Sequence, residues 1–284
     1  MTAHVLINGV EADTVHHSDR GFQYGDGVFE TIAVINGVFL LWDAHMARLQ
    51  EGCQRLKIPL PDADLLWVEA NQLWHDGAVV MTRGILKIII TRGPGQRGYG
   101  VPSQVTATRL ISLTDWPDTL IPLSSRPCTV RCCQTRLGLN PQLAGIKHCN
   151  RLENILARAE WDDQAIVEGL LFDNDDQLIE GTMSNVFLVR EQCLSTSALD
   201  KVGVAGVMRA HVLEIAKKLG IKTHVGAISC SELNQANEVF LTNSLIGIWP
   251  VASIVQHGQK KMLTTHALTQ VLQQQLKPLF GQND

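Results

Sequence analysis

Short apolar runs that end at turn-forming residues are the feature of this sequence that most constrains its fold. Residues 4–7 end at Asn8-Gly9, and residues 28–35 end at Asn36-Gly37, which leads into another apolar run at 38–41. Asn-Gly pairs favour the tight turns of β-hairpins. The first part of the chain is therefore predicted to contain a sheet of short, hairpin-connected strands.

Apolar residues at helical spacing alternate with further strand-like runs along the rest of the chain. This periodicity predicts helices from Asp43 to Pro59 and over 64–75, 150–162, 206–219 and 265–279, and strands over 85–91, 105–113, 167–172, 185–189, 221–225 and 238–241. The helix at 150–162 places Leu152, Ile155, Leu156 and Ala159 on one face. Mixed strands and helices of this kind are typical of α/β and α+β enzymes.

A stretch rich in proline and aspartate divides the chain. Pro117, Pro122 and Pro127 interrupt the pattern, and beyond them strands and helices alternate. We therefore expect two domains: a smaller N-terminal α/β domain at 1–115, a linker at 116–127 and a larger C-terminal α/β domain at 128–284.

Composition excludes several classes of function. The formal net charge is −4, without the clustered basic surface that a nucleic-acid partner favours. The apolar runs fall well short of the roughly 20 residues of a membrane span, and the N-terminus does not resemble a signal peptide. The seven cysteines are scattered and include adjacent Cys132 and Cys133, which suits a reducing, cytoplasmic compartment. Without paired C-x-x-C units they are better interpreted as buried thiols than as zinc ligands.

Residues 93–98 match the dinucleotide-binding pattern G-x-G-x-x-G and follow a predicted strand. A true fingerprint must also open a helix that meets the pyrophosphate. Here Tyr99-Gly100-Val101-Pro102 follows, which disfavours a helix. We interpret the segment as a mobile loop in which Arg97 and Tyr99 could bind a carboxylate; a simple solvated turn is the alternative.

Two lysines stand in apolar surroundings, Lys87 within a predicted strand and Lys147 just before a predicted helix. An amine that bonds covalently to a carbonyl cofactor must be neutral near neutral pH, and burial favours that form. The residues alone leave both lysines open, as candidates for this chemistry or as surface side chains.

Several motifs occur in order along nearly the whole chain. They are residues 22–30 (FQYGDGVFE), His45-x-x-Arg48-Leu49, Lys147-x-x-Asn150, residues 180–187 (EGTMSNVF) and residues 206–209 (GVMR). Together they resemble the fold-type IV pyridoxal-phosphate family, which includes branched-chain aminotransferases, D-amino-acid aminotransferases and aminodeoxychorismate lyases. Residues 140–153 (NPQLAGIKHCNRLE), and residues 91–93 with 97–99, are most similar to the lyases.

The resemblance implies a pyridoxal 5'-phosphate (PLP) cofactor bound by the C-terminal domain. Lys147 is expected to hold it as a Schiff base and to shuttle protons, and Glu180 to face its pyridine nitrogen. Its phosphate is expected to contact Arg48, the backbone N–H groups of Val207 and Met208 at a helix start, and the loop with Asn243 and Ser244. No metal is expected.

The resemblance also implies an activity. The expected reaction is the conversion of aminodeoxychorismate to 4-aminobenzoate and pyruvate in folate biosynthesis, with Arg97 and Tyr99 near the dianionic substrate. The alternative is an aminotransferase of D-amino or branched-chain amino acids. Tyr99 replaces a histidine of the D-amino-acid enzymes, and Lys87 lies about where branched-chain enzymes use an arginine, so both departures weigh against it. The family implies a homodimer, without nucleic-acid or membrane partners.

Overall fold

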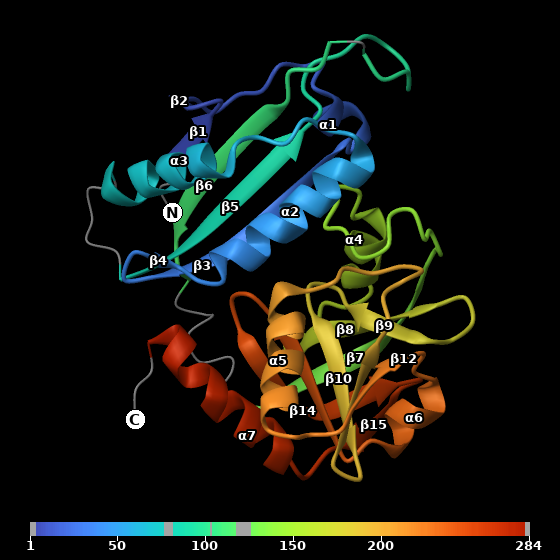
Figure 1. Ribbon diagram of the computed structural model, residues 1–284. Helices are drawn as coiled ribbons and strands as arrows, with labels where there is room; N and C mark the ends of the chain where they lie inside the picture. The colour runs from blue at the N-terminus through green and yellow to red at the C-terminus, as the bar shows by residue number, and fades with distance from the viewer. Residues whose placement is uncertain (1–3, 77–81, 103, 118–125, 282–284) are drawn as a thin grey trace. The chain divides into compact units, whose positions relative to one another are not determined.

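The computed structural model describes residues 4–76, 82–102, 104–117 and 126–281, which form two compact units (Figure 1). The first unit comprises Met1–Pro117 together with Ile146–Asn150, and the second comprises Asp118–Gly145 and Arg151–Asp284. This confirms the expected two-domain α/β fold. The short segment Ile146–Asn150 belongs to the first unit. The predicted boundaries placed it in the C-terminal domain, 128–284. Most of the expected linker, residues 118–125, lies outside the described residues.

The first unit is an antiparallel sheet with two long helices on one face (Figure 1). The strand order is β2-β1-β6-β5-β3-β4. Its elements are β1 (His4–Ile7), β2 (Val10–Glu11), α1 (Arg20–Tyr24), β3 (Gly27–Ile35), β4 (Val38–Phe39), α2 (Trp42–Leu56), α3 (Ala63–Asp76), β5 (Arg83–Thr91) and β6 (Thr108–Asp115). The predicted hairpins at Asn8-Gly9 and Asn36-Gly37 are confirmed.

Alternation along β3 separates the core of this unit from the opposite face of the sheet. Val28, Ile32 and Val34 are buried and belong to the same apolar cluster as Leu49 of α2 and Leu66 of α3. Side chains of successive strand residues point to opposite faces. Phe29 and Thr31 therefore lie on the face away from this cluster, and Thr31 is paired across the sheet with Lys87.

The second unit is built on a larger mixed sheet. Its strand order is β12-β11-β10-β13-β14-β7-β8-β9, with β15 paired to β14. The elements are β7 (Cys128–Leu137), α4 (Leu152–Arg158), β8 (Ile166–Asp173), β9 (Leu178–Gly181), β10 (Asn185–Arg190), β11 (Cys193–Ser197), α5 (Val207–Lys218), β12 (Thr223–Gly226), α6 (Cys230–Gln235), β13 (Glu238–Asn243), β14 (Gly247–Gln256), β15 (Gln259–Met262), α7 (Ala267–Leu276) and a 3₁₀ turn (Lys277–Phe280). Phe187 and Phe240 stack in its interior with ring centroids 4.9 Å apart.

The expected helix at 150–162 is the clearest local departure from the sequence analysis. Helix α4 ends at Arg158. Leu152, Ile155 and Leu156 are 72%, 61% and 62% exposed, so the predicted apolar face does not pack into the core of its own unit. The apolar spacing correctly groups these side chains on one face of the helix. It does not predict whether that face is buried or exposed.

The cysteines are free thiols. Cys53, Cys128 and Cys133 are buried, while Cys132 and Cys149 are partly buried. Burial raises the pKa of Cys53 to about 12, which leaves its thiol neutral and unreactive. Among the described residues, no helix is long and apolar enough to cross a membrane.

A buried glutamate of the sheet holds the start of α7. Glu238 on β13 is 3% exposed and accepts hydrogen bonds from the backbone N–H groups of Leu268 and Thr269 at 3.0 and 2.9 Å, and from the Thr269 hydroxyl at 2.7 Å. The N-cap residue of α7, His266, makes no side-chain hydrogen bond to the helix. A strand carboxylate therefore satisfies N–H groups that the first turn leaves without intrahelical partners.

Replacing Glu238 with Gln is expected to lower the free energy of unfolding by about 1–3 kcal/mol, because an amide cannot accept all three bonds. Urea unfolding at neutral pH measures this loss. Glu214→Gln on α5, where the side chain is 68% exposed, is the control and is expected to change stability by less than about 0.5 kcal/mol. Equal effects of the two substitutions would show that the helix does not depend on Glu238.

Candidate functional site

Lys147 lies on a short segment that runs beside the first residues of β3. The N–H of Phe29 donates to the Lys147 carbonyl at 2.9 Å, and the N–H of Cys149 donates to the Gly27 carbonyl at 2.9 Å. A Cβ on Gly27 would lie 2.7 Å from the carbonyl oxygen of Ile90 and 3.3 Å from Cys149 Sγ, so the close packing requires glycine there. The backbone of Lys147 is thereby fixed to the sheet.

The amine of Lys147 sits over an aromatic ring that it shares with Lys87. Lys147 Nζ lies 4.4 Å from the centroid of the Phe29 ring, and Lys87 Nζ lies 5.6 Å from the same centroid. A protonated lysine side chain within about 6 Å of a ring centroid is attracted to the ring by a cation–π interaction. The two lysines that the sequence left as alternatives thus converge on one face of the first unit.

Arg48 is anchored by the residue that follows Phe29. From α2, its Nε donates to Glu30 Oε1 at 2.8 Å and its Nη2 donates to Glu30 Oε2 at 2.5 Å. His45 Nδ1 lies 2.6 Å from Glu30 Oε2. Glu30 and His45 are both completely buried. This fork fixes the guanidinium of Arg48, and its expected contact with a phosphate remains a prediction.

The electrostatics of Glu30 depend on these two partners. Burial alone would raise the pKa of the Glu30 carboxyl, but the charge and hydrogen bonds of Arg48, with the hydrogen bond of His45, lower it to about 2. Glu30 is therefore ionised at neutral pH despite its complete burial.

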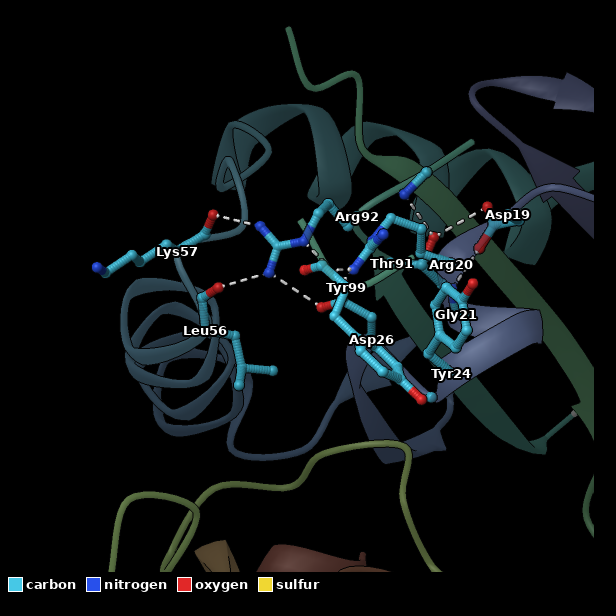
Figure 2. A network of polar contacts seen from close by, with 12 residues as sticks. Asp19, Arg20, Gly21, Tyr24, Asp26, Leu56, Lys57, Thr91, Arg92 and Tyr99 are labelled. Atoms are coloured by element: carbon cyan, nitrogen blue, oxygen red, sulfur yellow. Dashed lines mark hydrogen bonds and ion pairs between the residues drawn. The ribbon is translucent and has the colours of Figure 1, made fainter. Parts of the chain in front are cut away.

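The loop that carries Arg97 and Tyr99 is fastened to α1 through Arg20 (Figure 2). Arg20 Nη1 donates to the Gly98 carbonyl at 2.8 Å, and its Nη2 donates to the Tyr99 carbonyl at 3.5 Å. The Tyr99 ring meets the Tyr24 ring edge-on with centroids 5.4 Å apart. A loop with these backbone contacts is positioned by its neighbours and is more than a solvated turn.

Asp26 binds both Arg20 and Arg92, the residue just before the glycine-rich run (Figure 2). Its carboxylate accepts from Arg20 Nε at 2.9 Å and from Arg92 Nε and Nη2 at 2.7 and 3.0 Å. Burial favours the neutral acid, but the hydrogen bonds and charges of the two arginines outweigh it and lower the pKa of Asp26. Arg92 also donates to the carbonyls of Leu56 and Lys57 at the end of α2.

The glycine-rich run does not open a helix, in agreement with the rejection of a nucleotide fingerprint. Residues 92–102, all within the described part of the chain, contain no helical turn. Arg97 is exposed and Tyr99 is 84% exposed. Both side chains are accessible to a ligand, and their expected role in substrate binding remains a prediction.

Glu180 lies at the end of β9 in the second unit. It is 4% exposed, and its Oε2 accepts the backbone N–H of Val204 at 2.8 Å. The Val204 carbonyl in turn accepts from Asn185 Nδ2 at 2.8 Å. Val204 also pairs with Gly145, two residues before Lys147 in the sequence. The carboxylate is therefore held in one orientation by backbone.

Helix α5 begins at Val207, as predicted. Its N-cap, Gly206, has no side chain, and no side-chain hydrogen bond caps the helix. A Cβ on Gly206 would lie 2.0 Å from Asn185 Oδ1, so only glycine fits here. The first N–H groups of a helix attract anions, which suits the expected role of Val207 and Met208.

Asn243 and Ser244 lie at the turn after β13. Asn243 Oδ1 accepts the N–H groups of Leu245 and Ile246 at 3.0 and 2.9 Å, and its Nδ2 lies 3.4 Å from the Met183 carbonyl. The Asn243 side chain thus shapes its own turn and reaches the segment that follows Glu180. Ser244 is partly buried within the same turn.

Comparison with known proteins places these features in a family. The family model for amino-transferase class IV matches residues 27–254. The chain belongs to this family. It is 36% identical to an aminodeoxychorismate lyase of Vibrio harveyi over 94% of this chain and 97% of that protein. It is 29% identical to a D-alanine aminotransferase of Bacillus licheniformis, with 88% of each chain covered.

A solved structure of the class IV family shows the same fold. The crystal structure of a 4-amino-4-deoxychorismate lyase from Pseudomonas aeruginosa has a TM-score of 0.88 and 40% sequence identity. The match covers 96% of this chain and 98% of that chain.

Three buried or partly buried acids were not among the residues predicted from the sequence. Glu30 and Asp26 fall within the quoted motif at 22–30, but they were assigned no role. Glu168, which is 1% exposed, was not singled out either. The available signal was a charged residue inside an apolar strand, as in Val28-Phe29-Glu30-Thr31-Ile32, because such a charge must have partners when the strand is buried.

Glu30→Gln is expected to lower the free energy of unfolding at pH 7 by about 3 kcal/mol, because it leaves the Arg48 charge without its buried partner. The pKa of Glu30 is lowered from its ordinary 4.5 to about 2. Its stabilisation is therefore complete above pH 4.5 and is lost as the pH falls toward 2. Denaturant unfolding of both proteins between pH 7 and pH 2 measures this difference.

Glu51→Gln is the matched control on the neighbouring helix. Glu51 pairs with Arg55 at 3.5 Å, but its side chain is 61% exposed, so an effect below about 0.5 kcal/mol is expected. A difference between wild type and Glu30→Gln that does not change between pH 7 and pH 2 would contradict the assignment.

Proposed function

We propose that this protein is a 4-amino-4-deoxychorismate lyase, which converts aminodeoxychorismate to 4-aminobenzoate and pyruvate in folate biosynthesis. The observation that carries the proposal is similarity over nearly the whole chain, at 36% identity to the lyase from Vibrio harveyi against 29% to the D-alanine aminotransferase. The structural match to the Pseudomonas aeruginosa lyase supports the same choice.

The cofactor is pyridoxal 5'-phosphate, and the residues present fit it. When bound, PLP supplies an electron-accepting ring that lets a proton leave the amine-bearing carbon of the substrate. The uncapped start of α5 suits its phosphate. The Thr242 hydroxyl is buried and lacks a hydrogen-bond partner within the described part of the chain, on the strand paired with Asn185. Such a group fits a site that an additional acceptor completes.

Each of the proposed site residues then has a separate role. Lys147 binds the cofactor covalently through its amine and afterwards takes and returns the substrate proton. Glu180, held by the Val204 N–H, would be the carboxylate that faces the pyridine nitrogen. Val207 and Met208 donate backbone N–H groups to the phosphate, with Asn243 and Ser244 on the neighbouring turn and Arg48 as the guanidinium contact.

The substrate is a dianion, and the first unit offers cations on exposed positions to receive it. Lys87 is exposed, and its Nζ lies over the same Phe29 ring as the Nζ of Lys147. Arg97 is exposed on the loop fastened by Arg20. Carboxylates form strong hydrogen bonds with charged donors of this kind, and Tyr99 supplies a hydroxyl on the same loop.

An aminotransferase acting on D-amino or branched-chain amino acids is the second candidate. The observation that favours it is the similarity to the D-alanine aminotransferase over 88% of this chain. It would use the same lysine and the same carboxylate, with a keto acid as its product.

The purified protein is expected to release 4-aminobenzoate and pyruvate in equal amounts from aminodeoxychorismate. Lys147→Ala is expected to lose the long-wavelength absorbance of bound PLP together with all activity. Lys87→Ala is expected to keep that absorbance and to raise KM about tenfold, because it removes one charged hydrogen bond of roughly 1.5 kcal/mol. Chromatography of the products and absorbance spectra measure these outcomes. Absence of product, with rapid transfer of the amino group from D-alanine to the cofactor, would favour the aminotransferase.

The protein is further proposed to be a cytoplasmic homodimer. Leu152, Ile155 and Leu156 present an exposed apolar face on α4, and Met183 is 57% exposed in the same unit. Exposed apolar side chains gain free energy when a partner covers them. The occupant proposed here is a second copy of this chain.

Leu156→Glu is expected to shift the protein from dimer to monomer at micromolar concentration, because it introduces a charge into the covered face. Sedimentation velocity measures the mass of each form. Leu219→Glu, at a residue of similar chemistry that is 43% exposed beyond α5, is the control and should remain dimeric. A wild-type protein that sediments as a monomer would refute the dimer and leave the enzymatic proposal intact.

A further inference from the structure

Glu168 on β8 is a buried acid that the proposed function does not use. It is 1% exposed. Its Oε1 accepts the N–H groups of Gly169 and Thr182 at 2.9 and 3.0 Å, and also the Thr182 hydroxyl. Its Oε2 accepts the N–H of Met183 at 3.2 Å and the hydroxyl of Ser184 at 2.8 Å. A carboxylate has about four acceptor positions, so these five donors use its full capacity.

Four of the five donors belong to one turn, Gly181 to Ser184, and the fifth is the N–H of Gly169. The carboxylate occupies the inside of this turn. The turn is closed by the Gly181 N–H, which donates to the Ser184 carbonyl at 2.6 Å. A Cβ on Gly181 would lie 2.3 Å from Ser184 Oγ and 3.0 Å from Glu168 Cδ. The turn therefore has room for the Glu168 carboxylate and for no side chain at Gly181.

The residues on both sides of this turn form hydrogen bonds with Val204. Glu180, immediately before the turn, accepts the N–H of Val204 at 2.8 Å. Asn185, immediately after it, donates to the Val204 carbonyl at 2.8 Å. Val204 lies two residues before Gly206, the N-cap of α5, which packs directly on Asn185. A shift of the turn would thus move Glu180 and the start of α5 together.

We infer that Glu168 is a positioning residue: by filling the turn, it fixes Glu180 and the first N–H groups of α5 in the arrangement that holds PLP. This inference rests on the proposed function. An amide at position 168 would turn its NH₂ group toward at least one backbone N–H, because each oxygen of the carboxylate accepts such a donor. Two donors that face each other repel, so the turn would have to open.

The test compares Glu168→Gln with Glu238→Gln in the full-length protein. Both remove one buried carboxylate that accepts two or more backbone N–H groups and a threonine hydroxyl in the same unit, but Glu238 caps α7. Glu168→Gln is expected to weaken PLP binding at least tenfold and to shift the pH midpoint of the bound-cofactor absorbance. Glu238→Gln is expected to lower the melting temperature and to leave both cofactor measurements unchanged.

A second pair decides the case if Glu168→Gln does not fold. Thr182→Val removes one hydroxyl donor to Glu168 while keeping the shape of the side chain, and Thr182→Ser keeps the hydroxyl. PLP binding is expected to be weaker in the valine variant and close to wild type in the serine variant. Equal binding in this pair, or equal loss of PLP in Glu168→Gln and Glu238→Gln, would overturn the inference while the proposed function stands. Wild-type protein that binds no PLP would overturn both.

Discussion

The pairing of Glu30 with Arg48 and His45 is the interaction on which the first unit depends. A carboxylate at a fully buried strand position loses its hydration, which costs free energy. The hydrogen bonds from the Arg48 guanidinium and the contact with the His45 imidazole offset that cost. The same bonds tie α2 to β3 beside Phe29, whose backbone N–H in turn donates to the Lys147 carbonyl. The backbone of Lys147 is therefore linked to the Glu30 ion pair through two neighbouring residues of one strand.

The second unit solves the same physical problem with backbone donors in place of arginines. Glu168, Glu180 and Glu238 are all buried, and each accepts N–H groups from a turn or from the start of a helix. Donors fixed in this way do not have to reorganise when a ligand binds. The first N–H groups of α5 have no side-chain cap, and the proposed function assigns them to the cofactor phosphate. Rigid acids and an open helix start are what a charged cofactor requires.

Local patterns in the sequence predicted much of this architecture, because hairpin turns and helical spacing are read over a few residues. The hairpins at Asn8-Gly9 and Asn36-Gly37, and the start of α5 at Val207, follow from such patterns. β7 was missed because its apolar residues are interrupted by Arg131 and Gln134, and β14 because it contains Pro250. The motifs located Lys147 and Glu180, but the partners of Glu30 and Glu168 are distant in sequence and emerge only from the folded chain.

The two proposed activities share a first event, removal of a proton from the amine-bearing carbon, so the roles proposed for Lys147 and Glu180 do not distinguish them. The choice lies in what the bound substrate carries on the adjacent carbon. An enolpyruvyl ether there can leave as pyruvate, and the ring that remains becomes aromatic, which makes its departure favourable. Selection then depends on groups that recognise two carboxylates, and the first unit places Lys87 and Arg97 on exposed positions. In the proposed lyase, specificity would accordingly depend on where these cations lie relative to the substrate carboxylates.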